Sequence, residues 1–109
     1  MTLKSKVIIV TGASKGIGKS IAQLFHSKGA NVCLISRSRL LKKTFNNFSN
    51  NKKNLYFIGD ATDENFIKKV FINIFNKHKK IDALINNAGV SGLEKIHNIT
   101  EKRWDYVIN

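Results

Sequence analysis

The sequence predicts an α/β protein built on a doubly wound parallel sheet, and two observations support this fold class. Short, fully apolar runs alternate with longer stretches of helical periodicity along the 109 residues. Continuous apolar runs are typical of strands buried on both faces, and parallel strands need crossover connections between them. Such crossovers are right-handed and place helices on both faces of the sheet. With 42% hydrophobic residues, the chain has material for one domain and one modest core.

The first half of the chain predicts two strands and two helices. Residues 7–10 form the first strand, and a glycine-rich turn over residues 12–18 leads into a helix. That helix ends in a lysine and a glycine at residues 28–29, which are typical stop signals. Its apolar positions recur at helical spacing: Ile17, Ile21, Leu24 and Phe25. Residues 31–35 repeat the strand pattern, and residues 40–48 predict a weaker helix.

The third strand and the helix after it follow the same alternation. Residues 55–58 predict the strand, which leads into Gly59 and Asp60. Thr62 or Asp63 is suited to cap the helix that follows. One wide apolar stripe runs along this helix and predicts a core face rather than a ligand site: Phe66, Val70, Phe71, Ile74 and Phe75.

A fourth strand is predicted over residues 81–85, followed by a polar loop over residues 86–98 and a helix that opens at Thr100 and Glu101. Ligands of doubly wound sheets bind beyond the carboxyl ends of the strands, where successive connections diverge. The polar turns expected at that edge begin at Gly12, Ser36, Asp60 and Asn86.

Charge and composition narrow the class of partner. The net charge is +12, yet the lysines are spread as pairs at element ends and on polar helix faces. This distribution indicates a solvated surface and a biased composition, so neither nucleic acid nor a membrane is an expected partner. No signal peptide or stretch of about 20 apolar residues is found, which favours a cytoplasmic protein. Cys33 lies in an apolar run and predicts a buried thiol, and the histidines show no metal-ligand spacing.

The glycine-rich turn has the context of a phosphate-binding loop, because it follows a strand and opens a helix. Gly12 is expected to permit the tight turn, Gly16 to let the backbone approach a pyrophosphate, and Gly18 to let the helix pack closely. Free N–H groups at the start of the helix would then meet the anion. The turn therefore predicts a dinucleotide site.

A second interpretation of the same turn is a P-loop for ATP. Ala13, Gly18, Lys19 and Ser20 match a relaxed form of that pattern, and Asp60 after an apolar strand resembles a magnesium ligand. Under this interpretation Lys19 would reach the phosphates and Ser20 the metal. Alanine in place of the leading glycine weakens the match.

Two further motifs end the third and fourth strands. Asp60-Ala61 follows the third strand, and residues 86–89 read Asn-Asn-Ala-Gly. Together with Thr-Gly-x-x-x-Gly-x-Gly at residues 11–18, they resemble the N-terminal part of the short-chain dehydrogenase/reductase family, which includes 3-oxoacyl-carrier-protein reductases and sugar or polyol dehydrogenases. The resemblance implies a Rossmann-like sheet, incomplete at about four strands, with residues 1–109 as the front portion of one NAD(P)-binding domain.

The resemblance also implies positions for the cofactor. The Asp60-Ala61 pair would contact the adenine ring, small residues at 88 and 89 would admit the adenosine ribose, and the asparagines would tie neighbouring turns together. The expected cofactor-binding residues are Gly12, Ser14, Lys15, Gly16, Ile17, Gly18, Ser36, Arg37, Asp60, Ala61, Asn87, Ala88 and Gly89.

The end of the second strand predicts a preference between the two dinucleotides. An NAD enzyme would place an acidic side chain there, on the ribose 2'-hydroxyl, but Ser36 stands in that position. Arg37 offers a planar fork for a 2'-phosphate, and Lys15 adds a second cation. Similar NADP-preferring family members carry basic residues at these two positions. NADP(H) is therefore the expected cofactor, with NAD(H) possible.

Catalytic residues of the family are not expected within this chain. The family uses Tyr-x-x-x-Lys, but Tyr56 is followed four residues later by Asp60, and Tyr106 lies too close to residue 109. The expectation is a fragment or truncated product lacking the C-terminal catalytic portion. The whole protein would reduce a carbonyl or oxidise an alcohol of a small molecule, as a homodimer or homotetramer. A catalytically dead nucleotide-binding remnant is the alternative.

Overall fold

A computed structural model describes residues 2–48 and 52–87. It contains four strands and three helices in strict alternation, as the sequence predicts. The strands are β1 (Val7–Thr11), β2 (Asn31–Ser36), β3 (Leu55–Ile58) and β4 (Ala83–Ile85). The helices are α1 (Gly16–Ser27), α2 (Leu40–Phe48) and α3 (Glu64–His78). The helix predicted from Thr100 and most of the loop predicted over residues 86–98 lie outside the described residues.

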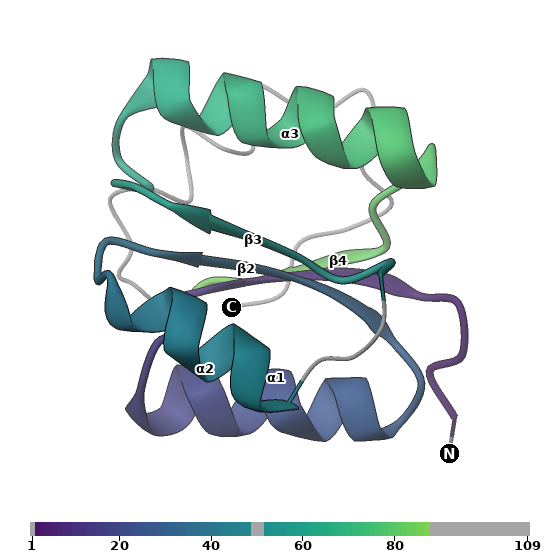
Figure 1. Cartoon of the computed structure of the whole chain (residues 1–109). Coiled ribbons are helices and arrows are strands. Elements are labelled where there is room, and N and C mark those ends of the chain that lie inside the picture. Colours follow the sequence, from purple (N-terminus) through teal and green to yellow (C-terminus); the bar gives the residue numbers. More distant parts are fainter. Residues whose placement is uncertain (1, 49–51, 88–109) are drawn as a thin grey trace.

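All strand pairs are parallel, and the sheet order is β3-β2-β1-β4. β2 and β3 are thus added in turn on one side of β1, and β4 is added on the other side of β1. The α3 helix covers one face of the sheet, and α1 and α2 cover the other (Figure 1). The predicted doubly wound arrangement is confirmed, and the diverging connections place the crevice next to the carboxyl end of β1.

Alternate residues of each central strand face different layers, because side chains alternate across a strand. Val7 and Ile9 pack with the buried face of α3, whereas Ile8 and Val10 pack with α1 and α2. Cys33 is fully buried on the α3 side, and this burial raises the pKa of its thiol to about 12. The predicted role of Cys33 as a small core hydrophobe is confirmed.

The predicted core face of α1 needs correction, and that of α3 needs one addition. Ile17 and Leu24, both assigned to the apolar face of the first helix, are 72% and 53% exposed. Small residues set how α1 approaches the sheet, so the face that packs inward is offset from Leu24 and consists of Gly18, Ile21, Ala22 and Phe25. In α3 the predicted stripe packs against the core, with Phe66 and Phe75 partly buried, and the fully buried residues also include Ile67.

The fourth strand begins two residues later than predicted. The backbone N–H of Val7 donates to the carboxylate of Asp82 at 2.8 Å, while the N–H of Asp82 donates to the carbonyl of Val7 at 2.8 Å. The carboxylate takes the donor that a strand carbonyl would otherwise use, so regular pairing starts only at Ile8 with Ala83. Ile81 lies outside the strand but is still buried in the core.

Candidate functional site

A pocket of about 290 Å³ lies at the carboxyl edge of the sheet. Its walls come from three turns far apart in the sequence, those after β1, β2 and β3. Seven of the predicted cofactor-binding residues line it: Gly12, Ser14, Lys15, Ser36, Arg37, Asp60 and Ala61. The topology of the sheet therefore brings together side chains and backbone that the sequence places up to 49 residues apart.

The glycines of the first turn differ in what surrounds them. Gly16 has a φ of 61° and no atom within 4 Å of where a Cβ would stand, so the backbone there is open to an approaching ligand. A Cβ on Gly18 would instead lie 2.8 Å from the carbonyl carbon of Gly12 and 2.7 Å from Nδ2 of Asn87. Gly18 therefore permits close packing of α1 under the turn, and Gly16 keeps space free beside it.

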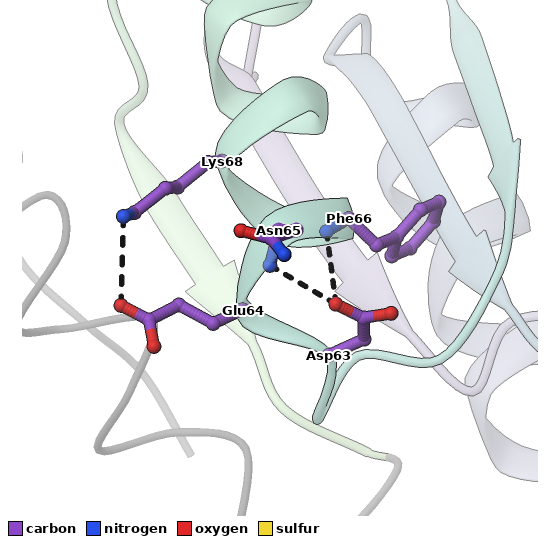
Figure 2. A network of polar contacts seen from close by, with 5 residues as sticks. All are labelled: Asp63, Glu64, Asn65, Phe66 and Lys68. Carbon is purple, nitrogen blue, oxygen red and sulfur yellow. Dashed lines mark hydrogen bonds and ion pairs between the residues drawn. The ribbon is translucent and has the colours of Figure 1, made fainter.

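The start of α1 has no side-chain cap, whereas the start of α3 has one. Lys15, the N-cap of α1, makes no side-chain capping hydrogen bond, and the first turn holds no acidic residue. In α3, by contrast, Asp63 accepts from the N–H groups of Asn65 and Phe66, and Glu64 adds an acidic side chain (Figure 2). Unpaired N–H groups and a positive dipole end make an uncapped helix start suited to an anion.

The turn after β4 is tied to the glycine turn by hydrogen bonds. The hydroxyl of Thr11 donates to Oδ1 of Asn86 at 3.0 Å and accepts from the N–H of Asn87 at 2.9 Å. Nδ2 of Asn87 donates to the carbonyl of Gly12 at 3.3 Å. The expected tie between neighbouring turns through asparagine side chains is present. Ala88 and Gly89 lie outside the described residues.

The wall formed by the end of β2 is basic. Ser36 is buried and its hydroxyl accepts from the N–H of Ser38 at 3.1 Å, while Arg37 is exposed beside it. Lys15, from the turn after β1, is also exposed and lines the same pocket. In the part of the chain that the structure describes, no carboxylate pairs with Lys15 or Arg37. Both cations are therefore available to an anionic ligand.

Asp60 shapes the third wall through local bonds. Its Oδ1 accepts from the backbone N–H of Thr62 at 2.8 Å and from the Thr62 hydroxyl at 2.7 Å. The N–H of Gly59 donates to the carbonyl of Ser36 at 2.9 Å, which joins this turn to the end of β2. These bonds hold Asp60 and Ala61 at the pocket wall.

Other predicted residues lie outside the pocket. Ile17 is 72% exposed, and with Gly16 it lines a shallow hollow on the outer side of α1, together with Lys19 and Ser20. The P-loop interpretation needs Lys19 and Ser20 at the phosphate site, and both lie in this hollow with Gly16 and Ile17, outside the pocket at the strand ends. One contributor was not predicted: Thr44 of α2 donates a buried hydrogen bond to the carbonyl of Ser14. Nothing in its sequence position signals this contact.

Comparison with known proteins gives the class of protein that the fold and pocket suggest. Residues 6–109 match the short chain dehydrogenase family, and the chain belongs to this family. It is 40% identical over 103 residues to an NAD-dependent glycerol dehydrogenase from Listeria innocua. The aligned region covers 94% of this chain and 40% of that protein. The chain is 37% identical over 113 residues to a 3-oxoacyl-acyl-carrier-protein reductase from Thermotoga maritima, which covers 100% of this chain and 45% of that protein.

Solved structures agree on the fold. A short-chain type dehydrogenase/reductase from Mycobacterium ulcerans superposes with a TM-score of 0.83 at 18% identity, covering 94% of this chain and 48% of that chain. The chain thus spans less than half the length of these relatives. Family membership leaves the P-loop interpretation without support. No helix in the described residues is long and apolar enough to cross a membrane.

Proposed function

We propose that this chain forms the cofactor-binding part of an oxidoreductase that uses NADP(H) to interconvert a carbonyl and an alcohol on a small molecule. The observation that carries the proposal is the pocket that joins the glycine turn to the ends of β2 and β3. When bound there, the dinucleotide would supply hydride transfer at its nicotinamide ring. Family membership supports the oxidoreductase class.

The residues present fit a dinucleotide. The open backbone at Gly16 and the uncapped start of α1 would receive the pyrophosphate, with Ser14 and Ile17 beside them. Asp60 and Ala61 would line the adenine end of the site. We place Gly12, Gly18 and Asn87 in a supporting role, since they set the shape of the turn. Ala88 and Gly89 complete the proposed set, from outside the described residues.

The preference for NADP(H) rests on this chain's own residues, because its relatives differ. The Listeria protein is named as NAD-dependent, and the name of the Thermotoga protein specifies no dinucleotide. Here Ser36 leaves the end of β2 without a carboxylate, and the free cations Arg37 and Lys15 face the same pocket. A 2'-phosphate would gain charge-assisted hydrogen bonds from the guanidinium fork.

The test is a calorimetric titration of the protein with NADPH and NADH. The double variant Ser36→Asp and Arg37→Ala should lower the NADPH-to-NADH affinity ratio by about ten- to a hundredfold, because it removes a charge-assisted contact and adds a repulsive carboxylate. Arg39→Ala is the matched control, since Arg39 is exposed two residues on but does not line the pocket. An unchanged ratio in the double variant contradicts NADP(H) preference, and tight ATP binding without NADPH binding contradicts the dinucleotide site.

The remaining parts of the proposal concern the whole protein. We propose that its catalytic residues lie outside residues 1–109 and that it works as a homodimer or homotetramer in the cytoplasm. Glycerol dehydrogenase and acyl-carrier-protein reductase relatives support a small hydroxy or oxo compound as substrate.

A further inference from the structure

A buried threonine on α2 is bonded to the glycine turn. The Oγ1 of Thr44 donates to the carbonyl oxygen of Ser14 at 2.7 Å, across 30 residues of sequence. Thr44 is 5% exposed and Ser14 is 8% exposed, so water is largely excluded from this bond. A threonine hydroxyl in a helix commonly bonds back to a carbonyl one turn earlier in the same helix. Here it is directed to another element instead.

The bond fixes the orientation of one peptide group. Peptide bonds in the described residues are all trans, and in a trans peptide the carbonyl and the N–H of the next residue point in opposite directions. The carbonyl of Ser14 points towards α2, so the N–H of Lys15 points away from α2. Ser14 and Lys15 both line the pocket, and Lys15 is the N-cap of α1. Rotation of this peptide would replace an outward N–H with a carbonyl oxygen.

The turn on its own would not hold that orientation. It contains positive-φ glycines on both sides of the Ser14–Lys15 peptide, at Gly12 and Gly16, where the backbone is conformationally permissive. The other hydrogen bonds found to this turn in the described residues are longer. The N–H of Ala13 donates to the carbonyl of Ile35 at 3.3 Å, Nδ2 of Asn87 to the carbonyl of Gly12 at 3.3 Å, and the N–H of Lys19 to the carbonyl of Lys15 at 3.4 Å. The Thr44 hydroxyl is thus the closest contact that restrains it.

We infer that Thr44 is a positioning residue that keeps the Ser14–Lys15 peptide turned with its N–H towards a bound pyrophosphate, an inference that rests on the proposed function. Since α2 follows the end of β2 that carries Ser36 and Arg37, the same hydrogen bond also joins the turn after β1, which would bind the pyrophosphate, to the turn after β2, which would bind the 2'-phosphate. A dinucleotide, whose pyrophosphate would need the N–H of Lys15, depends on this bond. A ligand without a pyrophosphate would be held by the side chains of Arg37 and Lys15, and its binding depends on the peptide orientation much less.

The experiment compares two ligands on three forms of the protein. NADPH carries both the pyrophosphate and the 2'-phosphate. Adenosine 2'-monophosphate carries the adenosine and the 2'-phosphate but no pyrophosphate. Thr44→Val removes the hydroxyl at nearly constant volume and should weaken NADPH binding by about five- to tenfold, the worth of one oriented hydrogen bond. Adenosine 2'-monophosphate affinity should change by less than about twofold under the same reasoning. Thr44→Ser keeps the hydroxyl and should restore NADPH affinity.

A control separates positioning from general loss of stability. Asn54 is also buried and accepts a hydrogen bond from the N–H of Val32 at 2.9 Å, but it lies before β3, at the amino edge of the sheet. Asn54→Ala should lower stability and leave both affinities unchanged. Equal weakening of both ligands in Thr44→Val, unchanged NADPH affinity, or failure of Thr44→Ser to restore it would overturn the inference. A wild-type protein that binds adenosine 2'-monophosphate but neither dinucleotide would contradict the proposed function itself.

Discussion

Two glycines of the turn oppose substitution for different reasons. At Gly16 the surroundings are open, and the restriction comes from its φ of 61°, a region that costs other residues roughly 1–2 kcal/mol. At Gly18 the backbone is ordinary helix, and the restriction is the nearness of Gly12 and Asn87. The first limit concerns conformation alone, and the second concerns packing of α1 against two turns.

The two alanine variants should therefore behave differently. Gly18→Ala places a Cβ 2.8 Å from a backbone carbon, so α1 or the turn must move, and we expect the free energy of unfolding to fall by about 2–3 kcal/mol. Gly16→Ala should cost only about 1–2 kcal/mol, yet weaken NADPH binding because its methyl group enters the open space. Urea denaturation and NADPH titration measure the two effects. Equal stability of Gly18→Ala and wild type would mean that the close approach of α1 is not maintained in solution.

At the scale of elements, the starts of α3 and α1 differ: the start of α3 is stabilised by side chains, and the start of α1 is left open for the proposed cofactor. The start of α3 has a side-chain cap, since Asp63 accepts hydrogen bonds from two N–H groups, and Glu64 pairs with Lys68 at 3.6 Å (Figure 2). The Glu64–Lys68 pair is exposed and contributes little. The start of α1 has neither cap nor acidic residue, so its N–H groups are left for the proposed cofactor.

The sequence left two residues as candidate caps for α3, and a substitution tests the structural assignment. Asp63→Ala should lower the free energy of unfolding by about 1 kcal/mol, the usual worth of an N-cap. Thr62→Ala should cost less, because the Thr62 hydroxyl bonds to Asp60 and no bond from it to the helix is found in the described residues. Urea denaturation of both variants gives the comparison. A larger loss for Thr62→Ala than for Asp63→Ala would contradict the assignment of Asp63 as the cap.

At the scale of the whole molecule, the fold was predictable because buried strands and half-buried helices leave different patterns of apolar residues in the sequence. Residues such as Ile9 and Ile35 lie in short apolar runs that are typical of a strand covered on both faces, and the turns after parallel strands meet at one edge of the sheet. The pocket residues of the first three strand ends followed from that rule. What the sequence could not predict depends on contacts between elements. Thr44 reads as an ordinary helix residue until α2 is placed beside Ser14.

The same limit applies to Asp82. Its position suggested the interior of an apolar strand, and only the placement of β1 beside β4 shows that its carboxylate receives the N–H of Val7, 75 residues away, and the ammonium of Lys80 at 3.0 Å. Burial pushes the pKa of this carboxyl upwards, but the Val7 hydrogen bond and Lys80 together outweigh burial and hold the pKa below its usual value.

Asp82 therefore makes stability depend on pH. Because its pKa is lower in the folded chain than in the unfolded chain, its stabilising contribution is complete above the unfolded value of about 3.9 and is lost as the pH falls through the folded value. Asp82→Asn keeps the side-chain shape and an acceptor for Val7 but removes the charge. The difference in unfolding free energy between wild type and Asp82→Asn, from urea denaturation, should be constant between pH 5.5 and 7 and shrink below about pH 4. Asp63→Asn is the control, because Asp63 lies at the start of α3, accepts backbone hydrogen bonds there and forms no ion pair with the residues that the structure describes. A gap that stays constant down to pH 3, or widens as the pH falls, would mean that the charge of Asp82 does not help to join β1 to β4.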